Sequence, residues 1–316
     1  MNVHHLRVFR EVATRGSFTA AAEALMLSQP AASLHVRSLE RELAVRLLER
    51  TPRGLVLTEP GEAVLAAATT IISTIEHMEQ AVAEMRGARR GRLLLGANTT
   101  GGMYVAPQVI AAYRAVHPEV EIVLQIEATE RLYERLAQGL LDVAIVGGPA
   151  EADRFDVRRL CHDRLVLIAH PDHRIVAAPR LRLADVARQD LILAEPSSRM
   201  RQLVEGVFRQ AGLAVRARLV LAGTEALKKA AESSLGVAFV SAYAVKREVA
   251  TGALRALPIV DAEFLRDYEL VSLKGRYLTP AITGFLQFAA EYGETNLVPP
   301  TLVPPRRSRA QPISPR

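Results

Sequence analysis

The sequence predicts an α+β protein of several domains, and three observations support this fold class. The first 58 residues contain short amphipathic helices and a small hairpin, and a long helix with a heptad pattern follows. From residue 93 onward, strands and helices alternate as they do in an α/β sheet domain. The length of 316 residues also exceeds the roughly 250 to 300 residues at which a single hydrophobic core stops growing.

Glycine and serine divide the N-terminal segment into three short helices. The first runs over about 4–14 and ends at Gly16, and Ser17 can cap the second. Ser28 can cap the third helix, which runs to about Glu42. We therefore expect three helices joined by short turns.

The third helix carries a polar face at its N-terminal half. Gln29, Ser33 and Arg37 lie one turn apart on this face, opposite an apolar stripe. Pro30 stands in the first turn, where its missing N–H costs nothing. In a helix-turn-helix, such a helix lies in the major groove with its N-terminal residues on base edges. A merely solvated helix face is the alternative, and the spacing alone leaves both open.

A small hairpin follows the third helix. Two strand-like runs, 47–50 and 55–57, flank a turn with proline second and glycine fourth. Arg50 and Arg53 stand where a wing beside a recognition helix meets phosphates, which is the sequence-independent part of DNA binding.

A long helix is predicted over 58–86, capped by Thr58. Its apolar residues alternate four and three positions apart, and a seam kept at period 3.5 over three heptads is typical of a coiled coil. A helix packed on its own domain is the alternative. The expected dimer contact consists of Val64, Ala68, Ile71, Ile75, Met78 and Val82.

The formal charge of +6 is a weak argument for a nucleic-acid partner, because most of it lies in the C-terminal tail. Residues 298–316 hold four arginines and no acidic residue, which leaves +2 of the +6 for the rest of the chain. Six prolines in the same segment predict a disordered tail. The argument for DNA binding therefore depends on local residue patterns.

Five short motifs together resemble LysR-type transcriptional regulators. They are Gly16-Ser17-Phe18-Thr19-Ala20-Ala21-Ala22, Leu27-Ser28-Gln29-Pro30-Ala31-Ala32-Ser33, Leu47-Leu48-Glu49-Arg50, Leu57-Thr58-Glu59-Pro60-Gly61 and Leu136-x-x-Gly139-x-x-Asp142-x-Ala144. The resemblance covers the whole chain except the tail. It implies that Ser17, Thr19, Gln29, Pro30, Ser33, Arg37, Arg50 and Arg53 contact double-stranded promoter DNA.

The same resemblance implies how the chain is organised. A winged helix-turn-helix DNA-binding domain is expected over 1–60, a dimerising linker helix over 58–86, and an effector-binding domain over 92–297. The effector domain is expected to have two α/β lobes like those of periplasmic binding proteins. Lobe 1 would take about 92–165 and 270–297, and lobe 2 about 166–269. Dimers of the family typically pair into tetramers, and RNA polymerase is a further expected partner.

Two loops of the α/β region combine hydroxyl groups with a helix start. One is Asn98-Thr99-Thr100-Gly101-Gly102, and the other is Pro196-Ser197-Ser198. Hydroxyls and free backbone N–H groups at a helix N-terminus form a ready anion site, and two such loops facing each other across a cleft would hold an anion from both sides. Capping of their own helices by Thr100 and Ser198 is the alternative.

Further residues resemble one branch of the family, which includes regulators of carbon-fixation and sulfur-assimilation operons. They are Tyr104, Pro107 and the run Thr224–Lys228. That branch responds to phosphorylated or otherwise anionic metabolites, so the resemblance implies a small anionic effector. In the second loop, Arg199 adds a charge where the branch often has glycine, which favours a more highly charged anion. The expected effector-binding residues are Asn98, Thr99, Thr100, Thr129, Ser197, Ser198, Arg199, Arg201, Thr224 and Lys228.

Other classes of function find less support in the sequence. No nucleophile–base pair is apparent, and His170 and His173 lack further metal ligands, so we expect no enzyme, cofactor or metal. Cys161 can form no disulfide within the chain, and the longest apolar stretch, 63–72, is far shorter than a membrane helix. No signal peptide is evident, and a cytoplasmic location is expected. The alternative is a two-lobed small-molecule-binding protein or enzyme without promoter specificity.

Overall fold

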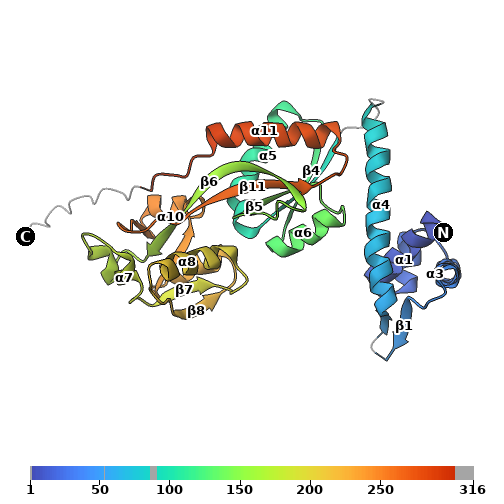
Figure 1. The fold of residues 1–316 in the computed structure, drawn as a ribbon, viewed down its shortest axis with the longest axis horizontal. Coiled ribbons are helices and arrows are strands. Elements are labelled where there is room, and N and C mark those ends of the chain that lie inside the picture. The colour runs from blue at the N-terminus through green and yellow to red at the C-terminus, as the bar shows by residue number, and fades with distance from the viewer. Residues whose placement is uncertain (1, 53, 86–90, 303–316) are drawn as a thin grey trace, which may run out of the picture.

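The computed structural model describes residues 2–52, 54–85 and 91–302, and it confirms the predicted fold class. An N-terminal helical unit, a long helix and a two-lobed α/β unit follow one another along the chain (Figure 1). The helices are α1 Val3–Arg15, α2 Phe18–Ala24, α3 Gln29–Leu43, α4 Glu59–Met85, α5 Ala106–Val116, α6 Thr129–Ala137, α7 Leu183–Val186, α8 Arg199–Gln210, α9 Thr224–Glu232, α10 Lys246–Thr251 and α11 Pro280–Asn296. The strands are β1 Leu48–Thr51, β2 Gly54–Leu57, β3 Arg92–Ala97, β4 Glu121–Ile126, β5 Val143–Gly147, β6 Phe155–Ala169, β7 Leu191–Ala194, β8 Ala217–Leu221, β9 Val237–Ser241, β10 Arg255–Leu257 and β11 Leu265–Leu273.

The N-terminal unit forms as its caps predict. Ser17 Oγ accepts a hydrogen bond from Ala20 N, and Ser28 Oγ accepts one from Ala31 N, both at 3.3 Å. Gly16 ends α1 with a φ of 62°, a left-handed conformation that glycine adopts without a side-chain clash. Strands β1 and β2 pair as an antiparallel hairpin. Helices α1, α2 and α3 and the hairpin bury one hydrophobic core.

Helix α4 contributes to this core with its N-terminal half. Ala68 and Ile72 are fully buried there, and Val64 packs against them. The structure therefore places Val64 and Ala68 against the chain's own N-terminal unit rather than on an exposed dimer seam. The cause is that a 3.6-residue turn brings them onto the face that covers α1. Ile71, Met78 and Val82 remain exposed further along the helix.

The two lobes share strands. Lobe 1 has the strand order β4-β3-β5-β11-β6, and lobe 2 continues from β6 to β9-β7-β8, with β10 also on β6. Each lobe buries its own core, and α5, α6 and α11 cover lobe 1 (Figure 1). Strands β6 and β11 are thus the antiparallel pair that runs between the lobes.

Strand β6 is much longer than the sequence suggests. We predict a strand only over 165–169, whereas β6 begins at Phe155. Charged residues such as Arg158, Arg159 and Arg164 interrupt its apolar pattern, because one face of this strand meets solvent. Strand β11 begins at Leu265, so residues before the predicted boundary at 270 already join the sheet of lobe 1.

Part of the predicted tail, 303–316, lies outside the described residues, as does Arg53. None of the helices within the described ranges combines the length and apolar composition that crossing a membrane requires.

Candidate functional sites

A cavity of about 140 Å³ opens between the two lobes. The two hydroxyl-bearing loops line it, one from each lobe, as do the N-terminal residues of α6, α8 and α9. The predicted effector residues that the structure brings together here are Asn98, Thr99, Thr100, Thr129, Ser197, Ser198, Arg199 and Thr224.

Thr100 and Ser198 do not cap their own helices through their hydroxyl groups. Ser198 precedes α8 but makes no side-chain cap hydrogen bond, and the same holds for Thr100 before the short π-helix Gly101–Val105. Instead, the Thr100 and Thr224 hydroxyls form a 2.8 Å hydrogen bond across the lobes, and both side chains are buried. This bond joins the two walls of the cavity.

Arg201 and Lys228 do not line the cavity. Arg201 donates to Ala194 O at 2.9 Å and to Glu205 at 2.7 Å. The buried ammonium of Lys228 lies 2.8 Å from both Glu225 and Glu248. A cation that already has two carboxylate partners is poorly placed to bind an effector directly.

The cavity also contains charged groups that the sequence analysis missed. Arg266 of β11 lines it, together with Glu127, Glu130 and Glu195. Glu195 directly precedes the loop Pro196-Ser197-Ser198 and could have been noticed there. No local pattern marks Arg266, because it becomes part of the cavity only when β11 crosses between the lobes.

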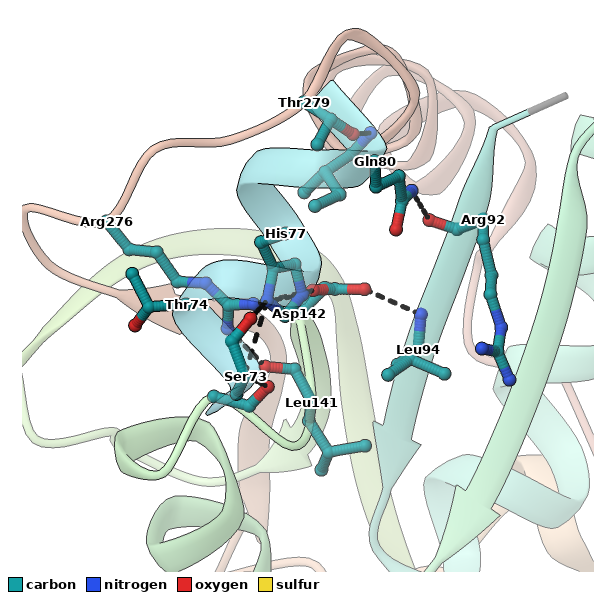
Figure 2. Close-up of polar contacts among 12 residues, drawn as sticks. Ser73, Thr74, His77, Gln80, Arg92, Leu94, Leu141, Asp142, Arg276 and Thr279 are labelled. Carbon is teal, nitrogen blue, oxygen red and sulfur yellow. Dashed lines mark hydrogen bonds and ion pairs between the residues drawn. The ribbon is translucent and has the colours of Figure 1, made fainter. Parts of the chain in front are cut away.

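A second cluster joins helix α4 to lobe 1 (Figure 2). His77 Nε2 lies 2.8 Å from Asp142 Oδ1, and Arg276 Nη2 reaches the same oxygen at 3.1 Å. The other oxygen, Asp142 Oδ2, accepts from Leu94 N at 2.7 Å. Burial lowers the pKa of Arg276, and the Asp142 carboxylate opposes that shift. We call Ser73, His77, Asp142 and Arg276 the linker junction.

Around the linker junction, side chains of α4 also bond to lobe 1 backbone. Ser73 Oγ donates to Gly139 O. Gln80 Nε2 donates to Arg92 O at 2.8 Å (Figure 2). Gly139 has a φ of 72°, and a Cβ there would come within 2.4 Å of Ser73 Oγ. The glycine and aspartate of the Leu-x-x-Gly-x-x-Asp motif therefore serve this contact.

The candidate DNA-binding residues lie on one side of the N-terminal unit. Ser17, Thr19, Gln29 and Arg50 border one hollow of about 300 Å³ between α2, α3 and the hairpin. Along α3, Gln29, Pro30 and Arg37 are exposed and Ser33 is half-buried. The geometry thus presents the first turns of α3 and the hairpin arginine to the same side.

Cys161 and the two turn histidines have structural surroundings. Burial raises the pKa of the Cys161 thiol to about 12, which keeps it in the unreactive thiol form. His173 Nδ1 accepts a hydrogen bond from Ile175 N at 3.2 Å and so caps a turn. Within the part of the chain that the structure describes, no group of three or more potential ligands could hold a metal ion.

Models of two protein families match the chain. The bacterial regulatory helix-turn-helix of the LysR family matches residues 3–62, and the LysR substrate binding domain matches residues 86–294. The chain belongs to the LysR family of transcriptional regulators. The predicted family is therefore confirmed, and its substrate-binding domain is the one that holds the cavity between the lobes.

Relatives of this LysR-family chain confirm the predicted branch. It is 30% identical to the HTH-type transcriptional activator CmpR of Synechocystis over 92% of this chain and 96% of that one. It is 32% identical to the RuBisCO operon transcriptional regulator of Allochromatium vinosum, over 91% and 95% of the two chains. The second of these regulators takes its name from the RuBisCO operon, in agreement with the carbon-fixation branch.

Solved structures of LysR regulators share the fold. Full-length CbnR in complex with its target DNA superposes with a TM-score of 0.71 at 22% identity, covering 93% of this chain and all of that one. The regulatory domain of CcmR from Synechocystis, in complex with 2-PG, superposes with a TM-score of 0.60 at 25% identity. That match covers 65% of this chain and 99% of the CcmR domain.

Proposed function

We propose that this LysR-type regulator changes its promoter binding when a small anion occupies the cavity between the lobes. The observation that carries the proposal is the cavity itself, which hydroxyl groups of both lobes and two arginines, Arg199 and Arg266, line. Ser198 also leaves the N-terminus of the twelve-residue helix α8 without a side-chain cap. The CcmR regulatory domain was solved with 2-PG, which supports a small ligand in this kind of domain.

The proposed DNA contacts divide into two kinds. The exposed N-terminal residues of α3, with Ser33, would reach base edges, and Arg50 would hold phosphate. Ser17 and Thr19 border the same hollow and would contact the sugar-phosphate backbone of the DNA there. Arg53 is proposed for phosphate as well, although it lies outside the described residues. CbnR in complex with its target DNA supports promoter DNA as the partner.

Oligomer formation is proposed to use the exposed half of α4. Ile71, Met78 and Val82 are exposed apolar side chains there, and Met78 and Val82 border a hollow of about 560 Å³. A second copy of α4 would cover them, and Ile75 is partly buried next to them. We propose a homodimer that pairs into a tetramer and acts with RNA polymerase, in the cytoplasm where promoter DNA lies.

Strand β5 gives the cavity a short path to α4. Asp142 directly precedes β5 and holds His77 of α4, while Gly147 ends β5 and packs against Arg266, which lines the cavity. An effector can act only through its different affinity for two arrangements of the protein. We propose that anion binding shifts the lobes and that the linker junction transmits the shift to α4.

Binding of an anion to the cavity should raise the thermal stability of the purified protein. An anion at about 100 times its Kd adds roughly 2.7 kcal/mol to the free energy of unfolding. A thermal-shift screen at fixed ionic strength would compare 3-phosphoglycerate, sulfate and acetate. The shift should vanish in Thr100→Ala and in Ser198→Ala, because both hydroxyls line the cavity. An unchanged thermal shift in both variants would show that the anion does not bind in this cavity.

Substitutions in the N-terminal unit should separate base contact from phosphate contact. Ser33→Ala should change the relative affinity for operator variants by about 1 kcal/mol or more, because it removes a contact to a base edge. Arg50→Ala should weaken binding to every DNA sequence alike. It should also reduce the slope of log affinity against log salt concentration by about one. Fluorescence anisotropy on an operator selected from a random DNA pool measures both, with exposed Arg216→Ala of lobe 2 as control. The opposite pattern would reverse the assignment.

A further inference from the structure

We propose that the interlobe cavity selects a compact oxyanion that also carries a hydrogen-bond donor, with Arg266 binding the oxyanion and Glu195 accepting from the donor. The donor is a hydroxyl or an ammonium group. This inference rests on the proposed function of the cavity and names its ligand class. It also adds two binding residues to the hydroxyl groups already placed there.

Arg266 is the most firmly held cation of the cavity. Its side chain is 6% exposed, Nε donates to Asp163 Oδ2 at 2.9 Å, and Nη2 donates to the Tyr268 hydroxyl at 3.0 Å. Burial raises the pKa of Tyr268, so the phenol stays neutral and adds no competing charge. A buried arginine with both of these partners is fixed in orientation before any ligand arrives.

One nitrogen of Arg266 is left for a ligand. Among the described residues, none accepts a hydrogen bond from Nη1. That nitrogen lies over Gly147, where an added Cβ would be 3.2 Å from both Nη1 and Cζ. The absence of a side chain at Gly147 thus leaves room for the guanidinium at the cavity wall. A guanidinium with a free N–H in a small cavity matches the geometry of an oxyanion.

Glu195 makes the cavity unsuitable for an anion that carries no hydrogen-bond donor. The other two carboxylates have cationic partners: Glu127 pairs with Arg135 at 3.3 Å, and Glu130 lies 3.8 Å from Arg199. Glu195 Oε2, in contrast, is buried and has no hydrogen-bond partner within the described parts of the chain. A buried acceptor without a donor is costly, and its negative charge repels an anion bound nearby. A ligand that brings its own donor supplies the missing hydrogen bond and so offsets the repulsion.

The position of Arg266 also connects ligand binding to lobe movement. Arg266 and Asp163 are direct neighbours across β11 and β6, the pair of strands that runs between the lobes. Their register is interrupted two residues further on, between Tyr268 and Glu269. An anion on Arg266 therefore acts at the point where the two lobes meet, rather than on one lobe alone.

Three matched ligands test the class. Lactate, alanine and propionate share a three-carbon carboxylate and differ at C2 by a hydroxyl, an ammonium or a hydrogen. Their counterparts with a phosphate on C3 are 3-phosphoglycerate, phosphoserine and the phosphate ester of 3-hydroxypropionate. Calorimetric titration of the full-length protein should show at least one donor-bearing anion binding about tenfold tighter than its donor-free counterpart, because a hydrogen bond to a charged group contributes at least that much.

Two variants test the residues. Glu195→Gln should reduce that preference to within about threefold and should tighten binding of the donor-free anion, since the repelling charge is gone. Arg266→Gln combined with Asp163→Asn removes both members of the buried pair together and should weaken every anion by about tenfold or more. The control is Arg164→Gln, an exposed arginine on β6 next to Asp163, which should bind all six ligands as the wild type does.

Each outcome decides between the inference and the wider proposal. If donor-free anions bind as tightly as donor-bearing ones, or if Glu195→Gln keeps the preference, the ligand class is wrong. If anions still shift promoter affinity in that case, the proposed function stands without this ligand class. If none of the six ligands binds the wild type, the ligand class fails. A measured response of promoter binding to any other anion then decides the proposed function separately.

Discussion

Replacing Asp142 by alanine should lower the stability of the two-lobed unit by about 3 to 5 kcal/mol, because it breaks a buried ion pair from one side. The carboxylate is 2% exposed and is shared by Arg276, His77 and the backbone N–H of Leu94. After the substitution, the Arg276 guanidinium has lost its carboxylate and the Leu94 N–H its acceptor. Thermal denaturation of the full chain, followed by circular dichroism, measures the loss.

Three further variants separate the contributions at Asp142. Asp142→Asn keeps the shape and one acceptor and should cost less than alanine does. His77→Ala should cost little stability, because His77 belongs to α4 and is partly exposed, but it should weaken the response of promoter binding to an anion. The exposed Asp153→Asn is the control. Equal midpoints of thermal denaturation for Asp142→Ala and Asp153→Asn would show that the linker junction does not stabilise the protein.

The N-terminal unit could be predicted because its signals are local. Ser17 and Ser28 cap helices through hydrogen bonds that span three residues, and Gly16 ends a helix by its own backbone conformation. Such features need no knowledge of distant parts of the chain. The same locality explains why the two hydroxyl-bearing loops could be placed at strand-to-helix turns.

The charged groups of the cavity could not be predicted for the opposite reason. Arg266 and Asp163 are 103 residues apart in the sequence. Only the antiparallel pairing of β11 with β6 brings them together. Lys228 is the converse case, a residue that the sequence predicts for the cavity and that does not line it in the structure. Its family motif is present, but its ammonium pairs with Glu248 of α10.

Helix α4 shows how one pattern can serve two contacts. Its 4-3 spacing predicts a continuous seam, yet Ala68 packs on α1 while Met78 is 58% exposed. A heptad pattern records only that one face of a helix is apolar. Which neighbour covers that face at each turn depends on where the N-terminal unit ends, and this is a tertiary property.

Replacing Gly61 by alanine should unfold the start of α4 and abolish promoter binding. A Cβ at Gly61 would lie 2.0 Å from Leu47 O, a backbone atom that cannot move aside cheaply. Thr58 fixes the same place, since its Oγ1 accepts from Gly61 N at 3.0 Å and donates to Arg46 O at 2.7 Å. We expect the N-terminal unit to lose about 3 kcal/mol or more of stability and the protein to lose at least tenfold in DNA affinity.

The matched control for Gly61→Ala is Gly206→Ala in helix α8. Nothing lies within 4 Å of a Cβ added at Gly206, so alanine there should be neutral or should add about 0.5 to 1 kcal/mol through its better helix propensity. Gly61→Ala should leave anion binding to the lobes intact while DNA binding is lost, because Leu47 belongs to the N-terminal core. If Gly61→Ala bound promoter DNA as Gly206→Ala does, the close contact between α4 and the hairpin would not be needed to orient α3.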